Sequence, residues 1–276
     1  MSINEKKVVN KHIVIGCTVI PGYIKEVGNF LIKDCVNTSL SYNPEFISQG
    51  DIINGIFFSD FILIGEGSKE AGDRLYEIYK NIGRCHNQDS SIHRMSPSSA
   101  EITKLSVNCF VTTKIAFANM IGDVADLTPD ANKFDILKAV GSDSRIGRKY
   151  LNPGYGFGGP CFPRDNRALG GYIKSIGIDP LIPDATDLSN KLHTQFQVNQ
   201  ILKTNIYNYT VEGAGYKEPC TVPIIEESQK LFIGAELAKK GVNVTVKDNK
   251  LLLDCVNLEY GNLFSYDQVW IILAII

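Results

Sequence analysis

The feature that most constrains the fold is a long stretch near the middle of the chain, residues 96–127. It opens on Ser96-Pro97, and the next proline after Pro97 is residue 129. Ser98 and Glu101 have the spacing of a capping box, in which two side chains satisfy the free amide groups of a first helical turn. Apolar residues recur at helical intervals behind them. These signals predict one long helix that ends near Leu127.

One narrow stripe of this expected helix is polar. Its members, which fall on one face at about 100° per residue, are Glu101, Lys104, Asn108, Thr112 and Asn119. The rest of the helix is so apolar that we expect it to be buried, and buried polar groups need partners. Two interpretations stay open. Neighbouring backbone groups satisfy the stripe, or Lys104 and Asn108 point into a cleft and stabilise a developing oxyanion.

Before the long helix, short apolar runs alternate with a helical pattern. The runs cover residues 12–19 and 60–64, and the helical pattern covers residues 70–82. Runs of this length between amphipathic segments are typical of βα units. Beyond residue 205, a helical pattern over 226–240 stops at Gly241, and strand-like runs cover 242–246 and 269–276. The sequence therefore predicts an α/β protein with a second, smaller α/β unit at its C-terminal end.

Composition narrows the classes of function. The formal net charge is −2, which gives no electrostatic reason to expect nucleic acid or an anionic membrane as a partner. The longest apolar run is far shorter than the roughly 18 residues of a membrane span. Seven cysteines are scattered without a CxxC pair or a zinc-like spacing, so no metal site is predicted. We interpret them as reduced thiols of a cytoplasmic protein.

Glycine and proline dominate residues 141–163, which predicts a structured loop, and Asp165 at its end is placed to cap a short helix through Tyr172. The dinucleotide fingerprint GxGxxG is matched literally by Gly154, Gly156 and Gly159. However, a true fingerprint follows a strand and opens a helix, whereas this one follows a polar segment and runs into Pro160. These glycines are better explained by close approach of the backbone to a ligand.

Cys161 follows directly after these glycines. A cysteine between Pro160 and Phe162 fits a buried, inert thiol, because free cysteine behaves as a small hydrophobic residue. Arg164 and Asp165 beside it favour a thiol tuned for reaction. Both interpretations stay open on the local sequence alone.

Four segments, in this order, resemble those of the nucleotide-sugar 6-dehydrogenases, the UDP-glucose/GDP-mannose dehydrogenase family. They are residues 17–22 (CTVIPG), 43–50 (NPEFISQG), 100–108 (AEITKLSVN), and 143–147 (DSRIG) leading into 156–165 (GFGGPCFPRD). A fifth, Gly215-Tyr216-Lys217 followed by Glu227-Ser228, is similar to the start of the family's C-terminal nucleotide-binding domain. Each segment is weak evidence alone, and the ordered set is specific.

The resemblance implies an α/β fold in three parts. Residues 1–92 would be a partial, Rossmann-like NAD-binding domain and residues 93–203 a central helical domain for catalysis and dimerisation. Residues 204–276 would be a truncated, Rossmann-like domain that binds the UDP-sugar. The partners implied are a UDP-sugar and a second copy of the chain, held through the central helix.

The activity implied is the NAD-dependent, two-step oxidation of a sugar C6 alcohol to a carboxylate, with UDP-glucose to UDP-glucuronate as the expected case. Cys161 would capture the aldehyde as a thiohemiacetal, which is oxidised to a thioester and hydrolysed. Lys104 and Asn108 would stabilise the oxyanions, and Glu45 would be the general base for hydrolysis. Asp165 and Thr18 would hold the water or relay protons.

The resemblance also assigns binding residues. Those expected to contact the substrate are Glu45, Phe46, Ile47, Gln49, Lys104, Asn108, Arg145, Tyr150, Asn152, Tyr155, Gly156, Phe157, Gly158, Tyr216 and Lys217. Those expected near the cofactor NAD are Cys17, Thr18, Val19, Gln49, Cys161 and Arg164. Arg145 would reach across a dimer interface, and Tyr216 and Lys217 would approach the pyrophosphate.

The sequence departs from the family pattern in four places. The strand and glycine-rich turn that normally precede the Thr18 segment are not present, so we expect the usual phosphate cradle to be missing. Gln49 stands where many members have a glutamate, Arg164 replaces a common lysine, and Glu226 replaces an arginine, which reverses a charge.

Two other functions stay open beside the enzyme. The first is a non-catalytic remnant, a dimerising module that binds a sugar nucleotide but cannot hold NAD. The second, supported by no motif, is a cysteine hydrolase with His193 as its base.

Overall fold

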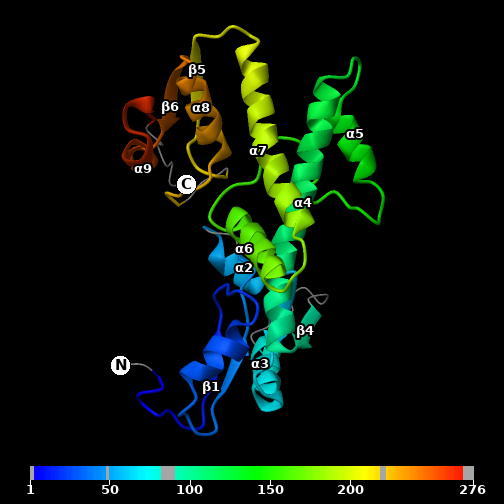
Figure 1. The fold of residues 1–276 in the computed structure, drawn as a ribbon, viewed down its shortest axis with the longest axis vertical. Helices are drawn as coiled ribbons and strands as arrows, with labels where there is room; N and C mark the ends of the chain where they lie inside the picture. The colour runs from blue at the N-terminus through cyan, green and yellow to red at the C-terminus, as the bar shows by residue number, and fades with distance from the viewer. Residues whose placement is uncertain (1–2, 48–49, 82–90, 218–221, 270–276) are drawn as a thin grey trace. The chain divides into compact units, whose positions relative to one another are not determined.

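The computed structural model describes residues 3–47, 50–81, 91–217 and 222–269. The chain divides into two compact units, an N-terminal unit of residues 1–107 and a C-terminal unit of residues 108–276. Each has helices packed on a small sheet, as the α/β pattern predicted (Figure 1). Helix α4 (Pro97–Asp126) contributes to both units. No helix among the described residues is long and apolar enough to cross a membrane.

The N-terminal unit contains a four-stranded sheet. Its strands, in spatial order, are β1 (His12–Ile15), β2 (Ser39–Tyr42), β3 (Phe61–Gly65) and β4 (Ser91–Met95). β1 pairs parallel with β2, and β3 pairs parallel with β4. The two pairs meet at a single antiparallel bridge between Tyr42 and Gly65. The strand predicted over 12–19 is thus shorter than expected, because the chain leaves the sheet after Ile15 and Pro21 has no amide to donate.

Side chains of β3 alternate between two apolar layers, as strand geometry requires. Ile62 and Ile64 pack with Leu75 of α3 (Lys69–Asn81), on the helix predicted over 70–82. Leu63 packs in another cluster with Tyr42 and with Ala100 of α4. The remaining short helices of this unit are η1 (Ile24–Gly28), α1 (Asn29–Leu31) and α2 (Ile52–Phe57). β3 is therefore buried on both faces, which is typical of an inner strand of Rossmann-like layers.

Helix α4 has the predicted length, but its predicted capping box is wrong. The Ser96 hydroxyl, and not that of Ser98, accepts a hydrogen bond from the backbone amide of Ser99 at 3.2 Å. Glu101 is fully buried and does not bond back to its own helix end. Its carboxylate instead accepts hydrogen bonds from the amides of Gly22 and Ile24. A tertiary contact has replaced the local one that the spacing indicated.

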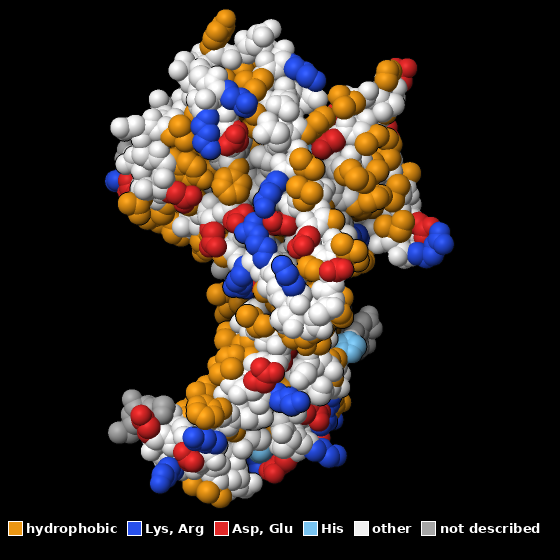
Figure 2. All heavy atoms as spheres, in the orientation of Figure 1, with side chains coloured by type: hydrophobic (Ala, Val, Ile, Leu, Met, Phe, Trp, Pro, Cys, Tyr) orange, Lys and Arg blue, Asp and Glu red, His pale blue; other side chains and the backbone are white. Residues whose placement is uncertain are grey.

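The C-terminal unit begins with the rest of α4 and three further helices. They are α5 (Lys133–Val140), α6 (Phe162–Ser175) and α7 (Leu181–Leu202). α6 begins at Phe162, with a proline in its first turn, so Asp165 is a buried residue inside the helix and the prediction that it caps the helix is wrong. Residues 141–161 between α5 and α6 form the predicted loop. Figure 2 shows hydrophobic side chains gathered over α5 and the adjoining part of α4.

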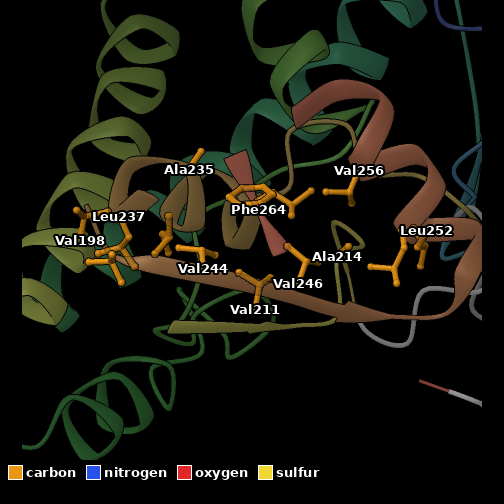
Figure 3. Close-up of a cluster of buried hydrophobic side chains, with 14 residues drawn as sticks. Val198, Val211, Ala214, Ala235, Leu237, Val244, Val246, Leu252, Val256 and Phe264 are labelled. Atoms are coloured by element: carbon orange, nitrogen blue, oxygen red, sulfur yellow. The ribbon is translucent and has the colours of Figure 1, made fainter. Parts of the chain in front are cut away.

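The C-terminal sheet has three parallel strands in sequence order. They are β5 (Asn208–Glu212), β6 (Asn243–Asp248) and β7 (Ser265–Gln268), joined by α8 (Gln229–Lys239), α9 (Lys250–Tyr260) and η2 (Gly261–Leu263). Valines of β5 and β6 pack against Leu237 of α8 and Val256 of α9, and Val198 of α7 joins the same core (Figure 3). The last turns of α7 are thereby fixed to this sheet.

The predictions for this sheet were close. The helix predicted over 226–240 begins three residues later, at Gln229, because Glu227 has a positive φ of 53° that no helical residue adopts. Gly241, predicted as a stop, has a φ of +87°, which favours glycine. The strand expected over 269–276 lies outside the described residues apart from Val269, and so does Gln49.

Candidate active site

Cys161 lies where the glycine-rich loop ends and α6 begins. It is the N-cap residue of α6, and its carbonyl oxygen accepts a hydrogen bond from the Asp165 amide at 2.9 Å. The residue is half-buried. The first turn of a helix has free amide groups and a partial positive charge, both of which favour an anion. The thiol therefore lies at the N-terminal end of α6 and is partly accessible.

Asp165 is a fully buried carboxylate one turn further along α6. Asn108 Nδ2 donates to its Oδ2 at 2.6 Å, and Arg164 donates through Nε and Nη2 to its Oδ1 at 2.8 Å. Burial opposes the charge of Arg164, but the hydrogen bond and charge of Asp165 outweigh burial and raise the pKa of Arg164. Buried charges need such partners. The structure thus brings together two of the predicted catalytic residues, Asn108 and Asp165, with Arg164.

A second thiol, Cys109 of α4, contacts the same aspartate and behaves differently. Its Sγ lies 3.5 Å from the backbone oxygen of Asp165, and only 7% of the residue is exposed. Burial, and then the charge of Asp165, raises the pKa of Cys109 to about 12. Cys109 is therefore a structural thiol, while Cys161 has the more open environment.

Lys104, also predicted to be catalytic, is held within the N-terminal unit. Its Nζ donates to the backbone oxygen of Glu45 at 2.5 Å and lies 4.2 Å from the centre of the Phe46 ring. The residue is 7% exposed, whereas Glu45 is exposed. Along α4, Lys104 and Asn108 share one face because they are four residues apart. The polar stripe is therefore satisfied by backbone at Lys104 and Glu101 and by side chains at Asn108.

Asn43 fixes the segment in which Glu45, Phe46 and Ile47 lie. Asn43 Nδ2 donates to the backbone oxygen of Leu63 at 2.8 Å, and the Tyr79 hydroxyl donates to Asn43 Oδ1. Phe46 and Ile47 are half-buried. The carboxyl end of β2 is thus rigid up to Glu45, whose side chain is free to reach solvent or a ligand.

The residues predicted near NAD lie in the loop after β1. Cys17 is exposed and Thr18 is half-buried. Val19 packs against the apolar cluster that contains Tyr42 and Leu63. In open α/β sheets, ligands bind at the carboxyl ends of parallel strands, where this loop lies. Cys17, Thr18 and Val19 therefore lie at the edge of the sheet where such folds bind ligands, and their contact with NAD stays a prediction.

The pyrophosphate of a dinucleotide normally binds free amide groups at a helix N-terminus after a glycine-rich turn. After β1, the comparable amides of Gly22 and Ile24 already donate to the Glu101 carboxylate, at 2.7 and 2.8 Å. β3 also leads into a short turn with two glycines, Gly65 and Gly67, at the start of α3, and the Gly67 amide donates to the Ser41 hydroxyl at 3.1 Å. The amides of Gly22, Ile24 and Gly67 thus already have acceptors within the protein.

Two buried asparagines hold the glycine-rich loop of the C-terminal unit. Asn119 of α4 accepts from the Gly154 amide at 2.9 Å and donates to the Tyr155 oxygen at 3.1 Å. Asn190 of α7 accepts from the Phe157 amide at 2.8 Å and donates to the Phe157 oxygen at 2.9 Å. The loop has no strand partner, so these side chains replace one.

The glycines of this loop are required by close contacts. A Cβ on Gly156 would lie 2.3 Å from Asn190 Oδ1, and one on Gly158 would lie 2.2 Å from the backbone oxygen of Glu227. A Cβ on Gly159, whose φ is +80°, would lie 2.3 Å from the Tyr216 ring. The close neighbours at Gly156, Gly158 and Gly159 are protein groups, and nothing lies within 4 Å of a Cβ on Gly154, so the approach to a ligand stays a prediction.

Several predicted substrate contacts lie on exposed surface. Arg145 is bound through Nη2 to Asp143 Oδ2 at 2.7 Å, and Tyr150 has a positive φ of 61° with its ring edge against Phe162. Asn152 and Tyr155 are exposed, and Lys217 lies 5.7 Å from the Tyr216 ring. In contrast, Phe157 is buried, and the glycines on either side of it, Gly156 and Gly158, are half-buried.

The sequence did not identify the residues of α7 that form hydrogen bonds with the glycine-rich loop. Asn190 and His193 are buried, and His193 Nε2 lies 2.8 Å from the Gly154 oxygen while its Nδ1 lies 2.9 Å from Asp123. A pocket of about 330 Å³ borders this contact, with Tyr155, Phe196 and Tyr209 in its walls. No member of the predicted catalytic set lines it. The missed signal was the helical spacing of buried polar residues in α7.

Two models of one protein family match the chain. The model of the UDP-glucose/GDP-mannose dehydrogenase family, NAD binding domain, matches residues 1–83, and that of the family's central domain matches residues 98–192. The UDP-glucose 6-dehydrogenase of Rickettsia bellii (strain RML369-C) is 34% identical over 239 residues, which are 86% of this chain and 54% of that protein. That of Rickettsia prowazekii (strain Madrid E) is 34% identical over 268 residues, 94% of this chain and 61% of that protein.

Among solved structures, a UDP-glucose dehydrogenase from Pyrobaculum islandicum superposes with a TM-score of 0.86 at 28% identity. The match covers 97% of this chain and 61% of that one. The chain spans about half to three fifths of the length of the relatives it matches. With two domain models in order, relatives at this identity and a shared fold, the chain belongs to the UDP-glucose/GDP-mannose dehydrogenase family.

Proposed function

We propose that the protein oxidises the C6 alcohol of a UDP-sugar, UDP-glucose to UDP-glucuronate, with NAD as the acceptor and Cys161 as the nucleophile. The observation that carries the proposal is the position of Cys161, which is half-buried at the N-terminus of α6 and one turn from a buried Asp165. Membership of the family and the names of its relatives support the reaction class. NAD, when bound, supplies the acceptor for hydride.

In the first oxidation, C6 loses a hydride and its hydroxyl loses a proton, which gives an aldehyde. Cys161 Sγ then forms a bond to C6, and the aldehyde oxygen takes up a proton to give a thiohemiacetal. Loss of a second hydride and of that proton gives a thioester. Water attacks C6, the carbon–sulfur bond breaks, and the products are a carboxylate and the free thiol. Two hydrides leave and one water is consumed for each sugar.

Hydrogen-bond donors and a base are needed around this carbon. We assign Asn108 and Lys104 as donors to the oxyanion, because both are amide or ammonium groups fixed on one face of α4. Asp165 would orient the water or receive a proton, with Thr18 as a relay. Glu45, the exposed carboxylate of this set, would be the general base for hydrolysis.

The sugar nucleotide would be bound by the glycine-rich loop and its neighbours. The backbone at Gly156 and Gly158 would approach the ligand, since neither residue has a side chain, while the Phe157 amide donates to Asn190. Tyr150, Asn152 and Tyr155 present exposed side chains beside them. Lys217 would supply positive charge for the pyrophosphate, and Arg145 would supply it for the ligand of the partner subunit. Phe46 and Ile47 would border the sugar.

We propose a homodimer that forms through α4. Large hydrophobic side chains recur along one exposed face of the helix within the C-terminal unit, namely Phe110, Phe117, Met120, Val124 and Leu127. Clustered exposed apolar side chains of this size commonly mark an interface. Figure 2 shows hydrophobic side chains gathered over α5 and the adjoining part of α4. Free thiols at the five described cysteines fit a reducing compartment, and we place the protein in the cytoplasm.

A second function is favoured by one observation. The amides after β1 that resemble a phosphate site are occupied by Glu101. A chain that binds the sugar nucleotide but holds NAD poorly would act as a non-catalytic, dimerising module.

One experiment separates the two functions. The purified chain is mixed with NAD and UDP-glucose, NADH absorbance is followed, and UDP-glucose binding is measured by calorimetry on the same sample. Two NADH per UDP-glucose, lost in Cys161→Ser, are expected for the enzyme. Binding without NADH would reject the enzyme in favour of the module, and neither binding nor NADH would reject both.

A further inference from the structure

The side chain of Asn190 makes both hydrogen bonds that the Phe157 backbone has to offer. Its Oδ1 accepts from the Phe157 amide at 2.8 Å and its Nδ2 donates to the Phe157 oxygen at 2.9 Å. Asn190 lies in the middle of α7 and is 6% exposed, and Phe157 is 3% exposed. An amide side chain is suited to this role because it carries one acceptor and two donors. Phe157 is therefore fixed as a residue in a strand would be.

The contact leaves little freedom around Phe157. Gly156 approaches Asn190 so closely that a Cβ there would lie 2.3 Å from Asn190 Oδ1. One turn along α7, the Thr194 hydroxyl donates to Gln229 Oε1 at 2.8 Å, and the same oxygen would lie 3.1 Å from that Cβ. Gln229 Nε2 in turn donates to the Glu227 oxygen at 3.2 Å. The loop thus runs across a row of buried amides that belongs to α7 and α8.

Cys161 stands four residues after Phe157 on the same short segment. Between them, Gly159 donates from its amide to the Glu226 oxygen at 3.1 Å. Asn119 fixes the other side of the loop at Gly154 and Tyr155. The loop is therefore fixed on one side of Phe157 by Asn119 and on the other by the Gly159 amide. A displacement at Phe157 must be absorbed by residues 156–158, the part proposed to contact the sugar nucleotide.

We propose that Asn190 is a positioning residue that fixes the sugar-nucleotide loop through the Phe157 backbone and so sets the affinity for UDP-glucose. The proposal rests on the proposed function. Without the amide, the Phe157 N–H and C=O would stay buried and unpaired, and the loop would move to reach water. Asn190 touches neither the reacting carbon nor the thiol, and its effect is on the shape of the loop.

The test compares Asn190→Ala and Asn190→Asp with Asn199→Ala, an exposed asparagine on the same helix whose side chain contacts Gln195. Aspartate keeps the acceptor for the Phe157 amide but places an oxygen against the Phe157 carbonyl. Hydrogen exchange of peptides covering 154–159 is measured without ligand, and the Kd of UDP-glucose by calorimetry. We expect exchange at least tenfold faster in Asn190→Ala, an intermediate value in Asn190→Asp, and no change in Asn199→Ala.

The Kd of UDP-glucose should rise about tenfold or more in Asn190→Ala, rise less in Asn190→Asp and stay unchanged in Asn199→Ala. A structural role alone would speed exchange equally in peptides of α9 and leave Kd within twofold, and either outcome would overturn the proposal. If the wild-type chain does not bind UDP-glucose, the proposed function fails. The exchange data, which need no ligand, still decide whether Asn190 holds the loop.

Discussion

The Glu101 carboxylate accepts a hydrogen bond from the backbone amide of Ile24 at 2.8 Å, and the two groups are 77 residues apart in the chain. A second bond, from the Gly22 amide at 2.7 Å, completes the contact. The glutamate is fully buried, so the first turn of α4 is tied to the segment that follows β1. This contact holds the loop that contains Thr18.

Glu101→Ala is expected to destabilise the protein by about 2–3 kcal/mol, because it leaves buried amide groups without an acceptor. Urea unfolding measures the change. Glu70→Ala, which removes an exposed ion pair with Arg74 on α3, is the control and should have little effect. Equal losses in the two variants would contradict the role of Glu101.

Iodoacetamide should distinguish the two cysteines near Asp165. Burial and the charge of Asp165 raise the pKa of Cys109 to about 12, so its thiolate is scarce at pH 8 and its side chain is shielded. Mass spectrometry of the native protein should find Cys161 modified and Cys109 intact. The assignment is checked with Cys161→Ser, and both sites should react after unfolding. Comparable native rates would show that Cys109 is accessible.

The contribution of Asp123 to the free energy of unfolding should decrease as pH rises. Burial raises its pKa, and the charge of Asp126 adds to this, while His193 and Lys133 oppose it. A carboxyl group whose pKa is higher in the folded chain binds its proton more tightly when folded. Its contribution to stability is therefore present below the unfolded pKa of about 3.9 and is lost as pH rises through the folded pKa.

Asp123→Asn removes this titration. The wild-type free energy of unfolding minus that of the variant should therefore fall between about pH 4 and pH 7, measured by urea unfolding. Asp143, whose pKa is lowered by hydrogen bonds from Arg145, is the control of opposite sign. A difference for Asp123→Asn that rises with pH would contradict the prediction.

Phe117→Glu should halve the mass of the protein in solution. The ring lies on the exposed apolar face of α4, and a charge there is costly to bury against a second copy. Lys138→Glu on α5 changes an exposed charge outside that face and should leave the mass unchanged. Sedimentation of the wild type as a monomer would reject the dimer directly.

Local signals predicted the elements in which they agree with the fold. α3 and α4 were found because periodic apolar residues and few breakers coincide there. The helix at Leu181–Leu202 was missed because its buried face is mostly polar. That face consists of Pro183, Thr186, Asn190, His193, Thr194 and Val198, which have helical spacing without an apolar pattern. A search for apolar periodicity cannot detect such a helix.

In the candidate site, too, sequence motifs predicted some residues and only the structure identified others. The ordered motifs pointed to Cys161, Lys104, Asn108 and Asp165, and the structure gives hydrogen-bond partners for the side chains of the last three, each within its own unit. Asn190 has no motif of its own, and its role depends on the Phe157 backbone, 33 residues away. Glu101 was assigned to the wrong partner because its spacing from Ser98 fits a local cap equally well.

By itself, the sequence determined the α/β class, the long helix and the family, since these depend on residue type, period and order along the chain. Only the tertiary structure decided which buried polar groups satisfy one another. Those choices depend on which segments packing brings within about 3 Å of each other, and a spacing in the sequence does not encode that distance.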